Sequence, residues 1–513
     1  MTFFESLLAL LLAAIVLTQV ARRLSLPYPA MLAAAGVVVA LIPGAPTIPI
    51  DPETALAIFI APALVDAAFD FPLRTARRFW GPLLIFAVLG VIVTTSLVAW
   101  LGWAFAGLPI AAAVALGAIV APPDAAAATA VLSTLSIPRN TDAVLRGESL
   151  FNDATALLLF GAALAVQSGG GLTPAVGIHL AIAAPGGILL GIAAALLVQR
   201  INHFVTGTLG GNLLQFVNSF LVWIVAERLG LSAVLCVVAF AMTLAHGTGL
   251  ASSPRMRVHS YAVWAAVVFV LNVFAFLLMG MQARTIVDSM PTEALRQAIV
   301  FAAMVIVVVL LARLALVIGY NRLTAWRAHR RGEPAPASVR QGVLVGWSGM
   351  RGLVTLATAF ALPADFPHRD LAVLTAFAVV LATLVVQGLT LGPLIRWLGL
   401  DRGEAFLGEL ALARVALADA ALATLSDETG DEAEHLRYEY AIARNAADDP
   451  ADTRPAHRRR ELGLRAIAAE RAQLEARRAD HELGIDAYNL LLEELDWREL
   501  TLLPDEERRI EES

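Results

Sequence analysis

Long apolar runs, separated by short stretches rich in Gly, Pro or Arg, fill the first 398 residues. None of the runs shows the period-two alternation of a half-buried strand. Most have about the 20 residues that a helix needs to cross a bilayer, and only helices or closed barrels can span lipid. We therefore predict an all-α polytopic membrane protein. The thirteen predicted spans are 5–21, 28–45, 53–70, 79–105, 108–135, 147–167, 174–200, 211–227, 231–249, 259–282, 294–320, 341–361 and 371–398.

Gly and Pro alone separate several of these runs, so twelve or fourteen spans are alternatives. Arginine is concentrated in the loops that follow odd-numbered spans. These loops hold Arg22, Arg23, Arg74, Arg77, Arg78, Arg139, Arg146, Arg200, Arg255, Arg257, Arg322, Arg327, Arg330, Arg331 and Arg340. The positive-inside rule places such loops in the cytoplasm. The N-terminus is then outside, the C-terminal tail is inside, and the regular alternation supports thirteen spans.

The first run resembles the apolar region of a signal peptide. It has no basic residue before it, and its positive charges, Arg22 and Arg23, come after it. We therefore expect a retained first span.

The composition changes abruptly at residue 399, which separates a predicted transmembrane domain (1–398) from a predicted cytoplasmic tail (399–513). The tail is rich in Ala, Glu, Asp and Arg, with apolar residues at helical spacing. This pattern predicts a bundle or hairpin of amphipathic helices. An oligomerisation or stabilising role and a regulatory sensor role both fit it.

The overall composition supports a membrane protein. Hydrophobic residues make up 58% of the chain, charged residues make up 16%, and the mean hydropathy is +0.72. A single cysteine, Cys236, excludes intrachain disulfides. The tail has no catalytic or phosphate-binding motif. We expect neither an enzyme nor a nucleic-acid partner, and no cofactor.

Two predicted spans contain sequences that interrupt a helix. The fifth contains Ala-Pro-Pro-Asp at 121–124, where two prolines remove two backbone donors. The twelfth contains Gly-Trp-Ser-Gly-Met-Arg-Gly at 346–352. Matched broken helices in two halves of a chain are typical of transporter sites built on inverted repeats. The alternative is a pair of unrelated kinks.

The sixth span begins with ionisable and polar residues, although the rest of it is apolar. Residues 147–155 read Gly-Glu-Ser-Leu-Phe-Asn-Asp-Ala-Thr. Ionisable groups inside a membrane are costly and usually functional. At i,i+4 spacing, Glu148 stacks on Asn152, and Ser149 stacks on Asp153. The oxygens of Ser149 and Asp153 suit a small alkali cation, and Asp66 of the third span lies deep enough to join them.

Glu148 needs a partner if it stays charged in a low dielectric. We predict an ion pair with Arg351 that braces the sixth span against the broken twelfth; the alternative is a solvated helix end. A carboxylate in a partly desolvated cavity can exchange protons near neutral pH. A cation and a proton would then compete for one site, and antiport follows if only the occupied site crosses the membrane.

These residues carry a family resemblance. The stretches 117–124 and 147–157 resemble the fifth and sixth helices of the sodium/proton exchanger family, which includes NhaP-like bacterial antiporters and their eukaryotic NHE relatives. Gly-Met-Arg-Gly-Leu-Val-Thr-Leu-Ala at 349–357 resembles its arginine helix, and 269–282 resembles its tenth helix. The resemblance covers most of 5–398. It implies a homodimer whose six-helix core moves as an elevator and exchanges Na⁺, Li⁺ or K⁺ for H⁺ across the plasma membrane.

The resemblance also implies roles for individual residues. Asp153 would bind the ion or proton, with Ser149 and Asp66 as accessory ligands of the transported Na⁺. Asn152 would hold the crossing region, Asp124 would be the charge of the unwound fifth helix, and a backbone carbonyl near Pro123 is a further ligand.

Asn152 leaves one titratable charge fewer than in electrogenic relatives, which suits electroneutral exchange. Pro123, Ala125 and Asp66 replace the family's usual Thr, Pro and Glu, and these departures leave the preferred cation open. A K⁺-selective exchanger is the first alternative; a cation channel and a sensor that signals through its tail are others.

Overall fold

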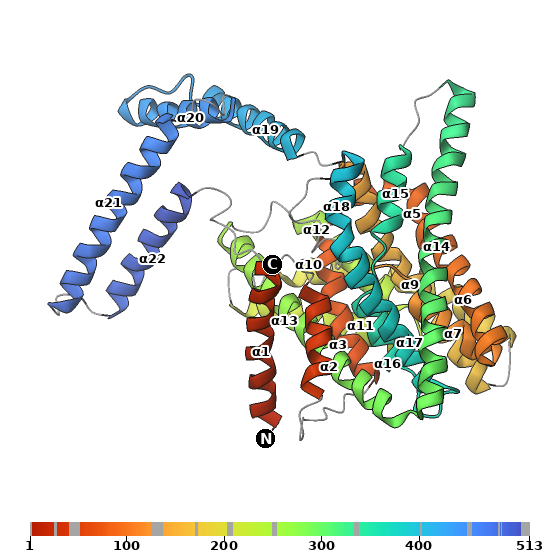
Figure 1. Cartoon of the computed structure of the whole chain (residues 1–513). Helices are drawn as coiled ribbons and strands as arrows, with labels where there is room; N and C mark the ends of the chain where they lie inside the picture. Colours follow the sequence, from red (N-terminus) through yellow and green to blue (C-terminus); the bar gives the residue numbers. More distant parts are fainter. Residues whose placement is uncertain are drawn as a thin grey trace. The chain divides into compact units, whose positions relative to one another are not determined.

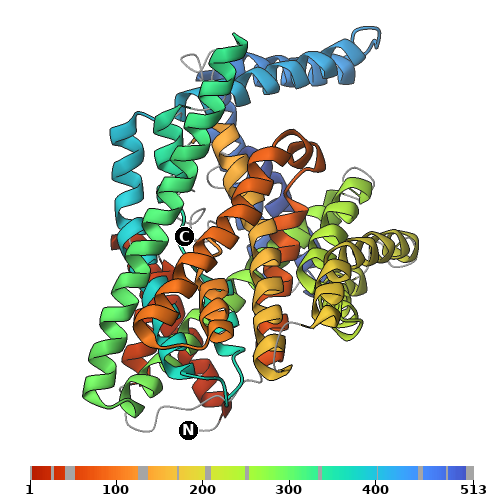
Figure 2. The ribbon, with the colours of Figure 1, turned by 90° about the vertical axis from the view of Figure 1, so that its right-hand side faces the viewer.

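The computed structural model describes residues 3–24, 28–40, 52–124, 137–169, 173–202, 209–248, 254–332, 338–400, 403–448, 454–480, 483 and 485–503. All regular elements in these residues are helices. The chain divides into two compact units, Met1–Asp401 and Arg402–Glu512. Figure 1 labels the helices and Figure 2 shows them turned by 90°.

The first unit is a bundle of helices with two π-helical turns, η1 and η2. Its elements are α1 (Phe3–Leu24), α2 (Tyr28–Ala40), α3 (Pro52–Phe69), α4 (Leu73–Arg78), α5 (Trp80–Leu84), η1 (Ile85–Gly90), α6 (Val91–Ala106), α7 (Ile110–Val120), α9 (Arg139–Gly169), α10 (Pro174–Asn202), α11 (Leu209–Arg228), α12 (Ala233–Thr248), α13 (Pro254–Ser289), α14 (Thr292–Arg331), α15 (Val339–Trp347), α16 (Leu353–Phe360), α17 (Arg369–Ala382), η2 (Thr383–Gln387) and α18 (Gly388–Leu398).

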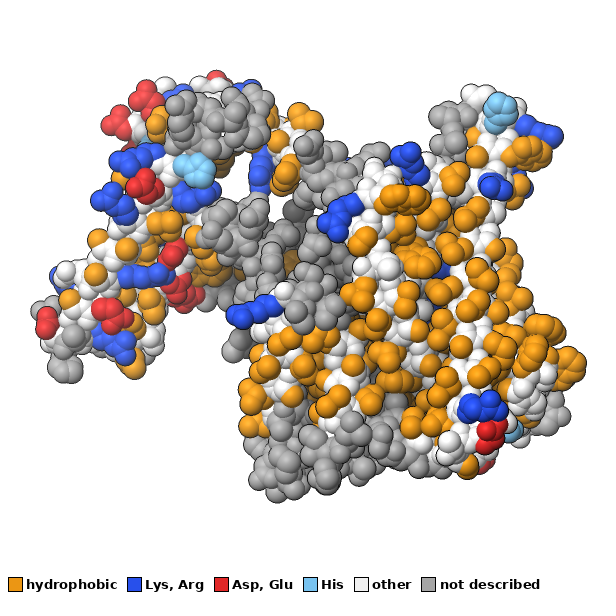
Figure 3. All heavy atoms as spheres, viewed as in Figure 1, with side chains coloured by type: hydrophobic (Ala, Val, Ile, Leu, Met, Phe, Trp, Pro, Cys, Tyr) orange, Lys and Arg blue, Asp and Glu red, His pale blue; other side chains and the backbone are white. Residues whose placement is uncertain are grey.

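Six helical stretches of the described chain are long and apolar enough to cross a membrane. They are Trp80–Ala106, Arg139–Gly169, Ala181–Ile201, Ser260–Leu278, Thr292–Arg331 and Arg369–Leu398. Figure 3 shows hydrophobic side chains over most of the visible surface of the first unit, with charged side chains mainly toward its ends. The predicted all-α membrane protein is confirmed at this level. The count of thirteen spans stays a prediction.

The helix breaks lie where the sequence predicts them. The helix of the fifth span, α7, ends at Val120, and residues 121–124 are not helical; residues 125–135 of that span lie outside the described residues. In the twelfth span, a non-helical segment at 348–352 separates α15 from α16. The interruption of the twelfth span is therefore confirmed.

The helices around these breaks pack closely. α7 packs against α6, α9 and α16, while α14 packs against α15 and α17. A Cβ atom at Gly117 would collide with the backbone of Thr95, so the glycine lets α7 approach α6 backbone to backbone. Both breaks are thus enclosed by protein, which is the condition under which non-helical backbone is tolerated at membrane depth.

The second unit contains α19 (Gly403–Thr424), α20 (Asp431–Asp448), α21 (Arg454–Ala479) and α22 (Ile485–Leu502). α19 packs on α20, and α21 packs on α22. A small core joins the latter pair, made of Ile467, Leu474, Tyr488 and Leu495. Arg471 of α21 forms ion pairs with Asp496 and Glu499 of α22. The described residues of this unit form helices, and the amphipathic cytoplasmic bundle stays a prediction.

Candidate functional site

The polar stretch of the sixth predicted span lies inside α9 and is buried. Glu148 is 2% exposed, Asn152 0% and Asp153 5%, and Ser149 is half-buried one turn before Asp153. An ionisable side chain is rarely buried to this degree without a partner or a function. Asp153 is therefore enclosed by the helices of the first unit, and its role in transport stays a prediction.

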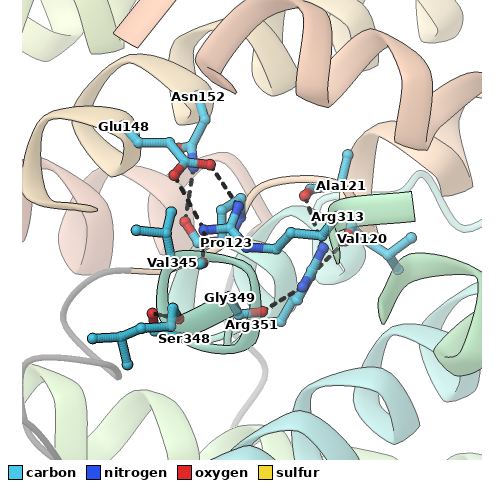
Figure 4. A network of polar contacts seen from close by, with 11 residues as sticks. Val120, Ala121, Pro123, Glu148, Asn152, Arg313, Val345, Ser348, Gly349 and Arg351 are labelled. Carbon is cyan, nitrogen blue, oxygen red and sulfur yellow. Dashed lines mark hydrogen bonds and ion pairs between the residues drawn. The ribbon is translucent and has the colours of Figure 1, made fainter. Parts of the chain in front are cut away.

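Asn152 joins α9 to the break that follows α7. Its side-chain Nδ2 donates to the backbone oxygen of Pro123 at 2.8 Å (Figure 4). The prolines and the helix end leave backbone oxygens in this region without their usual helical donors. The bond to Asn152 satisfies one of them and holds Asp153, the next residue, beside the break. The Asn152 Oδ1 atom is buried and has no hydrogen-bond partner among the described residues.

Asp124 connects the two broken spans. Its backbone N–H donates to the Met350 oxygen at 2.7 Å, and its Oδ2 accepts from the Leu353 N–H at 3.1 Å. Leu353 is the first residue of α16, so the carboxylate caps the positive end of that helix from another span. A Cβ at Gly352 would occupy the space of this carboxylate. Asp124 is also close enough to Asp153 for their charges to interact.

Arg351 supplies the opposite charge to the other helix end. The residue is 1% exposed. Its Nε donates to Val120 O at 3.2 Å and its Nη2 donates to Ala121 O at 3.3 Å, at the C-terminal end of α7. Its Nη1 donates to Gly349 O (Figure 4), and its backbone N–H donates to Thr383 Oγ1 at 3.0 Å. The arginine thus neutralises the negative end of α7, as Asp124 neutralises the positive end of α16.

The predicted ion pair between Glu148 and Arg351 is wrong. Glu148 pairs instead with Arg313 of α14, with Nη1–Oε1 at 2.5 Å and Nη2–Oε2 at 3.1 Å. Nη2 of Arg313 also donates to Val345 O at 3.1 Å. The guanidinium of Arg351 instead donates three hydrogen bonds to backbone carbonyls of the two breaks. The pair therefore braces α9 against α14 and α15 (Figure 4).

Arg313 was not predicted as a partner of Glu148, although the sequence contains a signal for it. It stands alone between Ala312 and Leu314 in the long apolar run of the eleventh predicted span. A lone arginine in such a run needs a partner as much as Glu148 does. Gly349 leaves room for the Arg313 side chain, because a Cβ at this position would collide with Cδ and Nε of Arg313.

Asp66 lies on α3, and its side chain is half-buried. α3 packs against α9, which carries Asp153, and against α16, which begins two residues after Arg351. The roles of Asp66 and Ser149 as cation ligands stay predictions. Among the described residues, no group of three or more His, Cys, Asp or Glu side chains is arranged to hold a resident metal ion.

Comparisons with known proteins agree with this geometry. Residues 8–397 match the model of the transmembrane sodium/hydrogen exchanger family. A Mycobacterium tuberculosis protein described as an uncharacterized Na⁺/H⁺ exchanger is 32% identical over 85% of this chain and 83% of its own. The low-affinity Na⁺/H⁺ antiporter NhaS1 of Synechocystis is 27% identical over 83% of this chain and 81% of its own.

A solved structure shows the same fold. The sodium proton antiporter MjNhaP1 of Methanocaldococcus jannaschii superimposes with a TM-score of 0.60 at 18% identity, over 78% of this chain and 99% of that protein. The family match extends over both breaks, the buried carboxylate and both arginines. The chain therefore belongs to the sodium/hydrogen exchanger family, whose members are membrane-spanning cation/proton antiporters and not enzymes.

Proposed function

We propose that this protein exchanges Na⁺, and with it Li⁺ or K⁺, for H⁺ across the plasma membrane, with Asp153 as the group that holds either ion. The observation that carries the proposal is the position of Asp153. It is buried directly after Asn152, whose amide is fixed to the Pro123 carbonyl of the break. This places a carboxylate beside non-helical backbone, where oxygen ligands for a cation are available.

One carboxylate that serves both ions makes the exchange obligatory. When ionised, Asp153 and its neighbouring oxygens bind a cation; when neutral, Asp153 holds a proton instead. The neighbouring amide of Asn152 does not titrate, so one cation would move for each proton. This supports electroneutral exchange and a role in pH homeostasis.

Broad cation selectivity is supported by one relative. A protein of Bacillus subtilis described as a sodium, potassium, lithium and rubidium/H⁺ antiporter is 27% identical over 74% of this chain and 60% of its own. Pro123 and Asp66 replace the family's usual Thr and Glu at positions predicted to provide cation ligands. These replacements would alter the size of the cation site. A K⁺-selective exchanger is therefore the second candidate.

The remaining features are part of the same proposal. The two breaks support thirteen spans with inverted repeats. They belong to the fifth and twelfth predicted spans, which are far apart in the sequence but contact each other in the fold. An elevator motion of the core within a homodimer is supported by family membership. The arginine-rich loops support an external N-terminus and a cytoplasmic tail. The change of composition at residue 399 supports residue 398 as the end of the transmembrane domain.

Proteoliposomes that contain the full chain and a pH-sensitive dye would test the function. Addition of Na⁺, Li⁺ or K⁺ should collapse an imposed pH gradient, and the response should persist when the membrane potential is clamped at zero. Asp153→Asn should abolish it. Asp142→Asn is the matched control, because Asp142 lies on the same helix but pairs with Arg146 at the surface. Full activity of Asp153→Asn would refute the site assignment.

A further inference from the structure

Gln387 is a buried polar residue that the transport site does not use. Its side chain is 0% exposed. Neither Oε1 nor Nε2 has a hydrogen-bond partner among the described residues. A buried amide without partners is costly, so a side chain of this kind in a native protein needs an explanation.

Two hydrogen bonds locate Gln387 relative to the break of the twelfth span. Thr383, four residues earlier, accepts the N–H of Arg351 at 3.0 Å. Thr390, three residues later, accepts the indole N–H of Trp347 at 2.9 Å. The two segments therefore run antiparallel, and Gln387 lies between the two contacts on the same helix face. Its amide is thus beside the non-helical residues 348–350.

The local backbone is irregular on both sides of this contact. Gln387 is the last residue of η2, a π-helical turn within the span Arg369–Leu398. Such turns are rare and often occur at functional sites. Among the described elements, η2 also packs against α17, α18 and α2, and α2 contains only apolar residues apart from Tyr28. The non-helical residues of the break therefore offer polar backbone groups near Gln387.

An amide offers both a donor and an acceptor. A cation would satisfy Oε1 but leave the Nε2 donors unpaired, whereas water can accept from Nε2 and donate to Oε1. Buried waters usually make about three hydrogen bonds to polar groups that otherwise lack partners. The backbone oxygens of Gly349 and Met350 each have one bond in the structure and can accept a second.

We propose that Gln387 binds ordered water against residues 348–350 and that this hydrated contact positions the broken twelfth span for transport. Gln387 is a positioning residue, because it acts on the segment that carries Arg351 and does not touch the transported cation. The transport effect rests on the proposed function, but the water site itself does not.

Gln387→Met tests the proposal in the full-length protein, because it removes the amide and keeps the length of the side chain. We expect a lower unfolding temperature by at least about two degrees. In proteoliposomes, the maximal rate of Na⁺-driven exchange should fall about tenfold, which corresponds to about 1.4 kcal/mol, while KM for Na⁺ changes less than about twofold. If the Gln387 amide binds no water, its removal should make the variant more stable and leave it fully active. That result would refute the proposal.

Thr375→Val is the matched control. Thr375 lies on α17 of the same span and is also buried with an unpartnered hydroxyl, but two turns before Thr383. Loss of this hydroxyl should leave the unfolding temperature and the rate unchanged or slightly raised. An equal loss in both variants would show that the effect is not specific to the break.

Gln387→Glu provides a second test if the methionine variant does not fold. A protonated carboxyl both donates and accepts, as the amide does, whereas a carboxylate only accepts. Burial favours the neutral acid over the carboxylate, so Gln387→Glu should keep at least about a third of the wild-type rate at pH 6. A loss at pH 6 as large as that of Gln387→Met would contradict the positioning role.

A high-resolution cryo-EM map tests the water directly. Density within hydrogen-bond distance of the Gln387 amide should be present in wild type and absent in Gln387→Met, in buffers with and without Na⁺. Density that requires Na⁺, or a large change in KM for Na⁺, would assign Gln387 as a cation ligand and overturn the proposal. If wild type exchanges no cation, the proposed function fails, but the map and the unfolding temperature still decide the water site.

Discussion

The Glu148 carboxylate and the Arg313 guanidinium form a two-bonded ion pair between α9 and α14, with exposed side-chain fractions of only 2% and 8%. Both residues come from helices with otherwise apolar surroundings. Such a pair gains its energy from close geometry and loses energy by desolvation, so its net contribution to stability is small. Removal of only one of the two charged side chains is far more costly, because the other charge then stays buried without a partner.

Glu148→Ala or Arg313→Ala should therefore destabilise the protein by about 3–5 kcal/mol, because each leaves one buried charge without a partner. The unfolding temperature of the purified protein measures this effect. The double variant Glu148→Leu with Arg313→Met removes both charges and should recover much of the loss. Single variants as stable as wild type would disprove the bracing role.

Arg351→Lys should also impair folding, although it keeps the positive charge. The ammonium cannot reproduce the planar fan of donors that reaches Val120, Ala121 and Gly349. We expect a loss of about 2 kcal/mol from unsatisfied carbonyls. Arg340→Lys is the control, because Arg340 makes one long bond to the Leu398 oxygen at 3.4 Å. Equal stability of the two lysine variants would mean that the charge alone matters.

Gly352→Ala should reduce transport strongly, because the new methyl group would displace the Asp124 carboxylate from the start of α16. Overpacking of this kind costs about 1–3 kcal/mol. Gly161→Ala on α9 is the control, since its Cβ would meet no atom within 4 Å and alanine favours helix. Dye dequenching and unfolding temperature should be near wild type for the control and lower for Gly352→Ala. Normal transport by Gly352→Ala would rule out the close fit.

Asn152→Leu should slow exchange without loss of Asp153. The variant removes the bond to the Pro123 oxygen, which leaves a buried carbonyl unpaired at a cost of about 1–3 kcal/mol. Because Asp153 then loses its fixed position beside the break, we expect at least a tenfold lower rate at saturating Na⁺. An unchanged rate would show that the helix alone positions the carboxylate.

Leu474→Ala tests the tail by itself. Leu474 belongs to the small core of α21 and α22, and its truncation should cost about 2–5 kcal/mol. Arg471→Ala breaks two partly exposed ion pairs and should cost less than about 1 kcal/mol. Limited proteolysis of the full chain should therefore cleave within this hairpin much faster in Leu474→Ala than in Arg471→Ala.

Much of this architecture could be predicted because its causes are local. Runs of apolar residues predict helices, and two adjacent prolines or closely spaced glycines stop a helix wherever they occur. The position of Asp153 within a helix also followed from the sequence. These features depend on neighbours in the chain and need no knowledge of tertiary packing.

The partner of Glu148 could not be found in this way. Both Arg313 and Arg351 are arginines in membrane segments, and the choice between them depends on which helices lie side by side. The break around Arg351 decides it, because backbone carbonyls of the two breaks accept hydrogen bonds from that guanidinium. The position of Gln387 next to the break depends on the same packing and could not be predicted from the sequence either.

Asp124 and Arg351 each neutralise a helix end of the other's span. This arrangement has a mechanical consequence. Each broken span ends on a group that belongs to the other, so separation would expose two helix ends and two ions to an apolar interior at once. The crossover should therefore behave as a single stiff piece. In the proposed elevator motion, this piece would move as a whole, and the contacts between the two broken spans would stay intact.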